Sequence, residues 1–321
     1  LEDGAKEFDA AVAEGLTERY QIPQAKAARL VEVARHRATR KADRDTYQAM
    51  EGFVHNLNTM HSRAGAQTPF SSINYGTDTS PEGRMVIKNI LLATDAGLGH
   101  GETCIFPIHV FKVKEGVNYN EGDPNYDLFK LSCKVSAKRL FPNYIFLDAP
   151  FNLQYYKPGH PETEVATMGC RTRVMGNVYD PTREISYSRG NLSFTSINLP
   201  RLAIESNHDE KLFYQKLDKM LDLVANQLLD RFEIQAAKRV YNFPFLMGQG
   251  VWLDSDKLGP NDEVREVLKH GTLSIGFIGL AETLTALYGH HHGESDEMQQ
   301  KGLQIVKYMR DYCDRKSQEM K

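Results

Sequence analysis

Hydrophobic positions in the first hundred residues recur at helical spacing and predict three helices. The first covers about Ala5–Gln21 and is followed by Pro23, which ends the periodic run. The second covers about Gln24–Arg37, and the third covers about Asp45–His61, with one apolar stripe along its length. Between them, Arg35–Arg44 is strongly basic, and we interpret it as a helix end and a solvated loop.

Short strands alternate with helices and loops from Ser62 onward. Small residues at 62–70 predict a turn, and Pro81 suits the first turn of a helix because its φ is already helical. The expected elements are a strand at Ser71–Tyr75, a helix at Pro81–Ala93, a buried strand at Cys104–Val113, a loop at 115–127, a strand at Tyr144–Leu147 and an irregular segment at 151–164.

The same alternation continues toward the C-terminus. Asn191–Ile204 is rich in apolar and β-branched residues and predicts a further strand. A long helix is expected after Asn207, because Glu210 stands three residues later, as in a capping box. Ile275–Ile278 predicts a short buried strand that leads into a helix ending before Gly289. This order of elements indicates an α/β architecture without internal repeats.

Composition supports a globular protein of one large or two ordinary domains, since the 321 residues are 41% hydrophobic and 25% charged. The formal net charge of −3 indicates neither nucleic-acid nor membrane binding. No apolar stretch reaches the ~20 residues that cross a bilayer, and the acidic N-terminus does not resemble a secretory signal, so we expect a cytoplasmic location. Because the chain begins without Met, we expect a piece of a longer protein.

The four cysteines stand at positions 104, 133, 170 and 313, and no two form a Cys-x-x-Cys pair. This spacing favours reduced thiols in a cytosolic protein over a zinc ribbon or a disulfide scaffold. A free cysteine is by default a small buried hydrophobic residue, so any functional role needs a further reason.

Several motifs that could carry chemistry are absent or have a simpler explanation. The sequence has neither a Gly-x-x-x-x-Gly-Lys-[Ser/Thr] phosphate loop nor a Gly-x-Gly-x-x-Gly dinucleotide loop. His290–His292 with the acidic residues that follow resemble a metal cluster, but adjacent histidines converge poorly and we interpret them as a polar surface loop. Asn191-Leu-Ser is a glycosylation sequon in form only, because no secretory signal precedes it.

Gly169 and Cys170 predict a tight turn that allows close approach to the sulfur. A turn alone would explain the glycine equally well. Arg171 and Arg173 either lower the pKa of the thiol or point away from it. Around Gly176 the sequence predicts a second tight turn.

Six blocks of sequence together resemble the anaerobic (class III) ribonucleotide reductases, which are glycyl radical enzymes. They are His61–Gly76, Ile105–Val113, Met168–Cys170, Gly190–Leu192, Ile197–Arg201 and Ile275–Glu282. The blocks stand in family order and cover most of the chain from about residue 45 to 290.

The resemblance implies a ten-stranded α/β barrel around a central finger loop, incomplete in this chain. Cys170 matches the cysteine that becomes a thiyl radical and abstracts the hydrogen from the ribose 3′-carbon, after which the 2′-hydroxyl leaves as water. Asn191 matches the asparagine that hydrogen-bonds the ribose hydroxyls, and Met168 matches the methionine of members that use formate as reductant. Thr172 matches a small hydroxyl residue near the substrate. The turn at 62–67 matches a segment that lines the substrate side of the barrel. Its residues Ser62, Arg63 and Gln67 are therefore assigned to substrate binding.

The same resemblance implies parts that this chain lacks. These parts are an N-terminal ATP-binding regulatory domain, the first barrel strand with a second active-site cysteine, and a C-terminal region with the glycyl radical and a four-cysteine zinc site. We therefore expect residues 1–321 to be the central part of the catalytic barrel domain, inactive by itself.

The expected partners are ribonucleoside triphosphate substrates, ATP and deoxynucleoside triphosphate effectors, a radical S-adenosylmethionine activase with an iron–sulfur cluster, and a second copy in a homodimer. Two alternatives stay open. One is another glycyl radical enzyme, such as a carbon–carbon lyase, on the same barrel. The other is a fragment without catalysis that binds nucleotides or dimerises, with the helix at 45–61 contributing to the interface.

Overall fold

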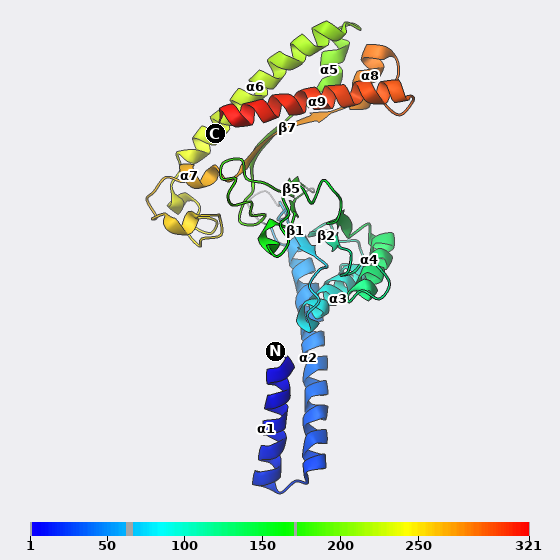
Figure 1. Cartoon of the computed structure of the whole chain (residues 1–321), viewed down its shortest axis with the longest axis vertical. Helices are drawn as coiled ribbons and strands as arrows, with labels where there is room; N and C mark the ends of the chain where they lie inside the picture. The colour runs from blue at the N-terminus through cyan, green and yellow to red at the C-terminus, as the bar shows by residue number, and fades with distance from the viewer. Residues whose placement is uncertain (1, 62–66, 170–171, 321) are drawn as a thin grey trace. The chain divides into compact units, whose positions relative to one another are not determined.

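The computed structural model describes residues 2–61, 67–169 and 172–320 (Figure 1). The chain divides into two compact units. Unit 1 consists of Leu1–Leu153 with Gly169–Thr172, and unit 2 consists of Gln154–Met168 with Arg173–Lys321. Both units mix helices with short parallel sheets, so the predicted α/β class is confirmed.

Unit 1 is built on a three-stranded parallel sheet in the order β1-β2-β3. Its elements are α1 (Glu2–Tyr20), α2 (Gln24–Thr59), β1 (Ser72–Tyr75), α3 (Pro81–Ala96), β2 (Ile108–Val113), α4 (Tyr126–Arg139) and β3 (Asn143–Phe146). The central strand β2 is the most buried of the three because it has a neighbour on each side. Phe111 at its centre is fully buried and packs with Leu91 of α3 and Val135 of α4.

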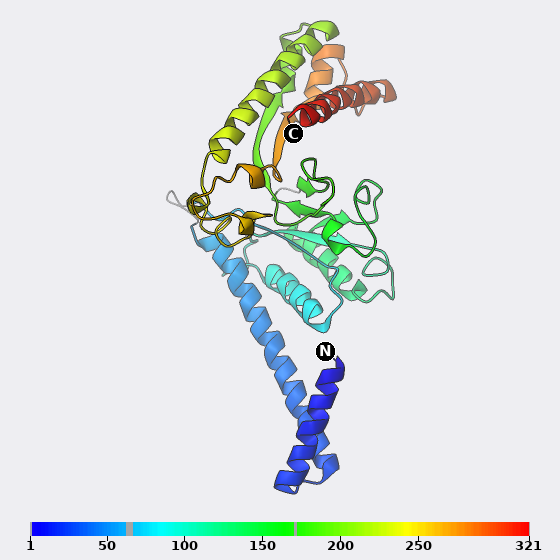
Figure 2. The ribbon, with the colours of Figure 1, turned by 60° about the vertical axis from the view of Figure 1, so that its left-hand side comes forward.

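The predicted loop at Arg35–Arg44 is wrong, because helix α2 continues unbroken from Gln24 to Thr59. Arg, Lys and Ala are good helix formers, and the stretch contains neither Gly nor Pro, so the basic residues lie on an exposed helix surface. Helices α1 and α2 lie side by side as a hairpin (Figures 1 and 2). Thus the charge run marks solvent exposure but does not interrupt the helix.

Two further expectations for unit 1 are corrected. The strand predicted at Cys104–Val113 begins at Ile108, directly after Pro107, which has no N–H for a strand ladder. The loop predicted at 115–127 ends as α4 begins at Tyr126, and this helix was not expected.

Unit 2 contains two two-stranded sheets, β4 with β5 and β6 with β7. The β elements are β4 (Ala166–Met168), β5 (Thr172–Val174), β6 (Asn191–Asn198) and β7 (Thr272–Ile278). The helices are η1 (Pro161–Thr163), α5 (Leu199–Ile204), α6 (Glu210–Ala236), η2 (Val240–Asn242), η3 (Ser255–Lys257), α7 (Arg265–Leu268), α8 (Leu280–Tyr288) and α9 (Asp296–Glu319). Strands β6 and β7 are parallel, with α6 beside them (Figure 2).

The largest apolar core of unit 2 joins the C-terminal half of β6 to α6, α8 and α9. Its fully buried residues include Ile197, Phe213, Leu221, Leu284 and Ile305. The predicted strand at Asn191–Ile204 is too long, because Asn198 ends it. The Asn198 side chain accepts a hydrogen bond from the backbone N–H of Arg201 at 3.2 Å and so begins α5, with Pro200 in the first turn.

The long helix α6 is confirmed, but its predicted capping box is wrong. Asp209 is the N-cap, and its carboxylate accepts from the N–H of Leu212 at 2.9 Å, so Glu210 is the first helical residue. Helix α9 was not predicted. It begins after Ser295, whose hydroxyl accepts from Met298 N–H at 3.3 Å.

The sheets formed by the described residues have three, two and two strands, and these do not close into a barrel. The mixed α/β class is therefore established, while the ten-stranded barrel stays a prediction.

Candidate functional site

The structure describes part of the predicted site. The described residues are Gln67, Met168, Thr172 and Asn191. Met168 and Asn191 belong to unit 2, and the other two belong to unit 1. The predicted residues that lie outside the described part of the chain are Ser62, Arg63 and Cys170.

Gly169 forms the tight turn that the sequence predicts, because its φ is +47°. Its backbone N–H donates to the Ser72 hydroxyl at 3.1 Å, at the start of β1. A Cβ at this position would lie 3.2 Å from the ring of Phe70. Both the left-handed backbone and the close ring therefore require glycine directly before Cys170. Gly176 has a φ of +53° and forms the second predicted turn.

Met168 and the first residues of β6 lie close together in unit 2. Gly190, directly before Asn191, has no side chain and faces the ring of Trp252 and the thioether of Met168. A Cβ on Gly190 would lie 3.2 Å from the Trp252 ring and 3.8 Å from Met168 Sδ. Trp252 is 6% exposed, and its indole N–H donates to the carbonyl of Val267 at 2.6 Å. The structure thus places Met168 beside the residue that precedes Asn191, and Asn191 itself is exposed.

Arg189 holds the backbone around the start of β6. Its Nε donates to the carbonyl of His270 at 2.9 Å, and its Nη1 donates to the carbonyls of Gly176 at 2.6 Å and Ile185 at 2.8 Å. One guanidinium therefore joins three chain segments. Burial lowers the pKa of Arg189 from its ordinary value, and the three carbonyls replace the lost water.

His270 stands two residues before β7, is 2% exposed and has a partner on each ring nitrogen. Nε2 lies 3.1 Å from Asp254 Oδ2, and Nδ1 lies 3.0 Å from the side-chain nitrogen of Asn177. Asp254 also accepts two hydrogen bonds from Arg183, at 2.9 and 2.7 Å. We call Asn177, Arg183, Arg189, Asp254 and His270 the β6–β7 network.

The charges of this network shift each other's protonation. Arg183, the main cause, together with Lys257 holds the pKa of the Asp254 carboxyl well below its ordinary value. Burial lowers the pKa of His270, although Asp254 acts in the opposite direction. The carboxylate is therefore ionised and the imidazole neutral at neutral pH.

Sequence reasoning missed all five members of the network. They come from positions 177 to 270, and no spacing rule joins such distant residues. The available signals were local. Arg189 stands directly before the Gly-Asn-Leu block, and His270 stands two residues before β7. Neither signal distinguishes a structural role from a functional one. The strand predicted as buried at Ile275–Ile278 is the second half of β7, which is half-buried at Ile275 and exposed at Ile278.

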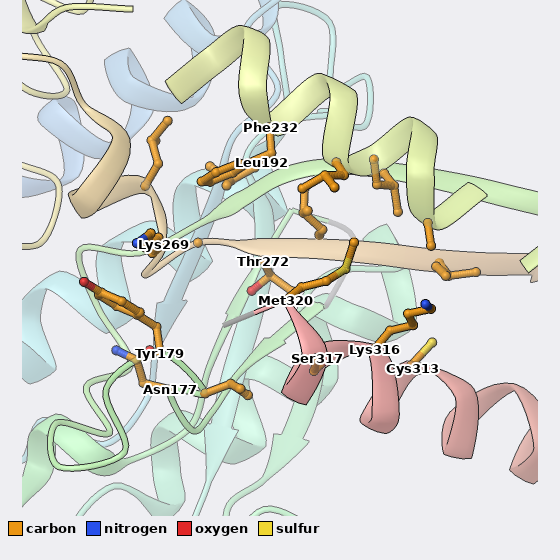
Figure 3. A pocket seen from close by; sticks show the side chains of 18 of the residues that line it. Asn177, Tyr179, Leu192, Phe232, Lys269, Thr272, Cys313, Lys316, Ser317 and Met320 are labelled. Carbon is orange, nitrogen blue, oxygen red and sulfur yellow. The ribbon is translucent and has the colours of Figure 1, made fainter. Parts of the chain in front are cut away.

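A cavity of about 360 Å³ lies beside β6 and β7 in unit 2 (Figure 3). Leu192, Leu228 and Phe232 form part of its apolar wall, while Asn177 and Lys269 bring polar atoms to it. Neither Asn191 nor Met168 lines it. The cavity therefore does not unite the predicted residues.

The interpretation of His290–His292 as a polar surface loop is confirmed, because all three histidines are exposed between α8 and α9. Across the described ranges, no group of three or more His, Cys, Asp and Glu side chains is placed to hold a metal ion. Within the same ranges, no helix has the length and apolar character to span a membrane.

A family model described as "Anaerobic ribonucleoside-triphosphate reductase" matches residues 4–321. The anaerobic ribonucleoside-triphosphate reductase of Escherichia coli K12 is 32% identical over 286 residues, which cover 88% of this chain and 39% of that protein. The enzyme of the same name from enterobacteria phage T4 is 34% identical over 263 residues, which cover 80% of this chain and 42% of that protein. The chain thus spans about two fifths of the length of these relatives.

Among solved structures, the chain is similar to an anaerobic ribonucleotide reductase from Thermotoga maritima in complex with dATP and CTP. The likeness has a TM-score of 0.45 at 14% identity, and it covers 85% of this chain and 41% of that chain.

Proposed function

The chain belongs to the anaerobic ribonucleoside-triphosphate reductase family, and from this membership we propose that the polypeptide containing it reduces ribonucleoside triphosphates to deoxyribonucleoside triphosphates without oxygen. The observation that carries the proposal is the family match over residues 4–321. The proposal concerns the complete polypeptide, because this chain spans about two fifths of its relatives.

In this proposal Cys170 carries the chemistry at sulfur. A thiyl at Cys170 takes the hydrogen atom from the ribose 3′-carbon, and the 2′-hydroxyl then leaves as water. The resemblance assigns the source of the radical to a glycine on a segment outside this chain, where an activase installs it. Catalysis then depends on holding sulfur against one carbon–hydrogen bond, which is an orientation effect. A low thiol pKa is not required.

Asn191 binds the ribose hydroxyls in the proposed mechanism. Its side-chain amide offers two donors and an acceptor without a net charge, which suits two neighbouring hydroxyls. Support comes from its position, since it is an exposed first residue of β6 and follows a glycine whose neighbours are Met168 and Trp252. The proposed further substrate contacts are Ser62, Arg63, Gln67 and Thr172.

Formate is the proposed reductant, and Met168 supports this part of the proposal. The overall reaction balances when one ribonucleotide, one formate and one proton give one deoxyribonucleotide, one carbon dioxide and one water. Formate loses two electrons as it becomes carbon dioxide, and the ribose 2′-carbon gains them as its bond to oxygen is replaced by one to hydrogen. The small anion needs a place close to the ribose, and the half-buried Met168 thioether beside Gly190 offers an apolar wall there.

The proposed partners are ATP and deoxynucleoside triphosphates as effectors, the activase, and a second copy of the chain, all in the cytoplasm. The test is anaerobic incubation of the complete, activated polypeptide with CTP, with and without formate. We expect dCTP only when formate is present. Formation of dCTP without formate would show that another compound is the reductant. An activated protein that never forms dCTP would favour the lyase alternative.

A further inference from the structure

We propose that His270 is a positioning residue for Asn191 and that it acts through the β6–β7 network. The inference rests on the proposed role of Asn191 in binding the ribose hydroxyls. His270 is fixed at three atoms, its two ring nitrogens and its backbone oxygen, and it stands two residues before Thr272, the partner of Asn191 in the strand register.

The hydrogen bonds of the ring define one orientation and one tautomer. The backbone N–H of Asp180 donates to Asn177 Oδ1 at 3.2 Å, so the amide nitrogen of Asn177 is the end that faces His270. This nitrogen can only donate hydrogen bonds, so Nδ1 of His270 accepts and Nε2–H donates to Asp254. A ring turned by 180° would place Cδ2 against the Asn177 amide and Cε1 against Asp254, and would lose both bonds.

The backbone of His270 transmits this fixed position to β6. Its carbonyl accepts from Arg189, two residues before Asn191, at 2.9 Å. The N–H of Thr272, two residues after His270, donates to the carbonyl of Gly190 at 3.0 Å. Asn191 is paired with Thr272 in the strand register. His270 and Thr272 therefore set the place where β6 begins.

The network is polar where an apolar core would suffice for stability. The other end of β6, at Ile197, is held by apolar side chains of α6, α8 and α9. Replacing buried charged groups by well-packed apolar residues is often neutral or stabilising, because ions lose hydration when they are buried. Directional hydrogen bonds instead select one geometry, which is what a ribose-binding amide requires.

The groups that face His270 come from several elements. Asp254 Oδ2 faces Nε2 and also accepts from Arg183, while Oδ1 accepts from Arg183 and Lys257. Arg189 holds the backbone, and the ring of Tyr179 lies edge-on with its centroid 5.2 Å away. Burial, with the charges of Arg183 and Arg189, lowers the pKa of His270 against the opposing effect of Asp254, so the imidazole stays neutral and keeps its acceptor nitrogen toward Asn177.

The experiment compares the Kd values of CTP and 2′,3′-dideoxy-CTP for the complete polypeptide by calorimetry. The ratio of the Kd of 2′,3′-dideoxy-CTP to the Kd of CTP reports how well the protein recognises the ribose hydroxyls. Its measurement needs neither the activase nor turnover. The variants are Asn191→Ala, His270→Leu, Arg189→Lys and the double variant Asn191→Ala/His270→Leu. Tyr312→Phe is the matched control, because it removes one hydrogen bond of unit 2, to Asp222, outside the network.

We expect Asn191→Ala to reduce the ratio about tenfold, and His270→Leu and Arg189→Lys to reduce it by at least about threefold. In the Asn191→Ala background His270→Leu should change the ratio less than about 1.5-fold, because the group it positions is gone. Tyr312→Phe should leave the ratio unchanged.

The outcomes separate the two claims. If Asn191→Ala reduces the ratio but His270→Leu and Arg189→Lys weaken both ligands equally, the network is only structural and the positioning role is wrong. If Asn191→Ala leaves the ratio unchanged, the proposed role of Asn191 is wrong, and the positioning role is overturned with it. If His270→Leu does not fold by circular dichroism, Arg189→Lys alone decides, since it keeps the charge and the aliphatic stem.

Discussion

Two buried histidines, one in each unit, show how differently the same side chain can be accommodated. His109 in β2 is 0% exposed, and its nitrogens face the hydroxyls of Tyr75 at 3.1 Å and Thr94 at 3.3 Å. His270 is 2% exposed, but it faces a carboxylate and an amide. Burial lowers the pKa of His109 to about 4, whereas Asp254 opposes the same effect at His270.

The difference lies in what each histidine holds in place. His109 satisfies two hydroxyls inside a mainly apolar and aromatic region, so it completes a core. His270 joins charged groups from separate segments at the start of β6, so it sets the position of backbone that carries an exposed amide. Equal burial therefore does not indicate the role of a histidine, whereas the chemistry of its hydrogen-bond partners does.

The largest effect is expected when the central carboxylate of the charged network is removed. Asp254→Ala leaves Arg183, Lys257 and the ring of His270 without their shared acceptor. Because these donors lose a partly buried charged partner, we expect unit 2 to lose about 3 kcal/mol of unfolding free energy. Urea unfolding monitored by Trp252 fluorescence measures the loss, since Trp252 is the chain's single tryptophan and belongs to unit 2. A loss below about 0.5 kcal/mol would show that the network contributes little to the fold.

The second prediction concerns the pH dependence of unit 1. Folded His109 stays neutral down to about pH 4, whereas the unfolded chain binds the proton near its ordinary value of 6.5. Acid therefore favours the unfolded state, and the stabilisation present above the ordinary pKa is lost as the pH falls toward 4. Between pH 7.5 and 5 this histidine should cost about 2 kcal/mol. His109→Gln, which cannot titrate, should remove that share of the pH dependence in urea unfolding followed by circular dichroism. An unchanged pH dependence in the variant would contradict the assignment.

The smallest effect is expected on the surface of the apolar core. Tyr312 donates to the Asp222 carboxylate at 2.6 Å, between α9 and α6. Tyr312→Phe keeps the ring in the core and leaves a carboxylate that water can reach, so we expect a loss of about 1 kcal/mol. Thermal unfolding at neutral pH measures it. A loss as large as that of Asp254→Ala would remove the contrast between the two ends of the sheet.

Elements with a strong local signal were predictable from the sequence. The Pro81 helix, the β1 strand and the end of α8 before Gly289 lie close to where the pattern places them. The failures have physical causes. A charge run looks like a loop in sequence but continues as helix in α2, and Asn198 ends a strand whose apolar pattern continues into α5.

Some residues of the candidate site also have a strong local signal in the sequence, and others have none. Met168 and Asn191 could be proposed as site residues because they stand in short recognisable blocks, and the φ of Gly169 confirms the predicted turn. The partners that hold Asn191 could not be found, because Arg189 and His270 are 81 residues apart and meet only in the folded chain. Local sequence therefore points to the proposed ligand contacts more readily than to the residues proposed to position them.

The central claim is that Cys170 carries radical reduction of a ribonucleotide. The most direct test measures dCTP formed from CTP and formate by the complete, activated polypeptide and by its Cys170→Ala variant. Cys133→Ala is the matched control, because Cys133 is an exposed free thiol of unit 1. We predict dCTP from the wild type and the control but none from Cys170→Ala, with CTP binding retained. Formation of dCTP by Cys170→Ala at the wild-type rate would contradict the account.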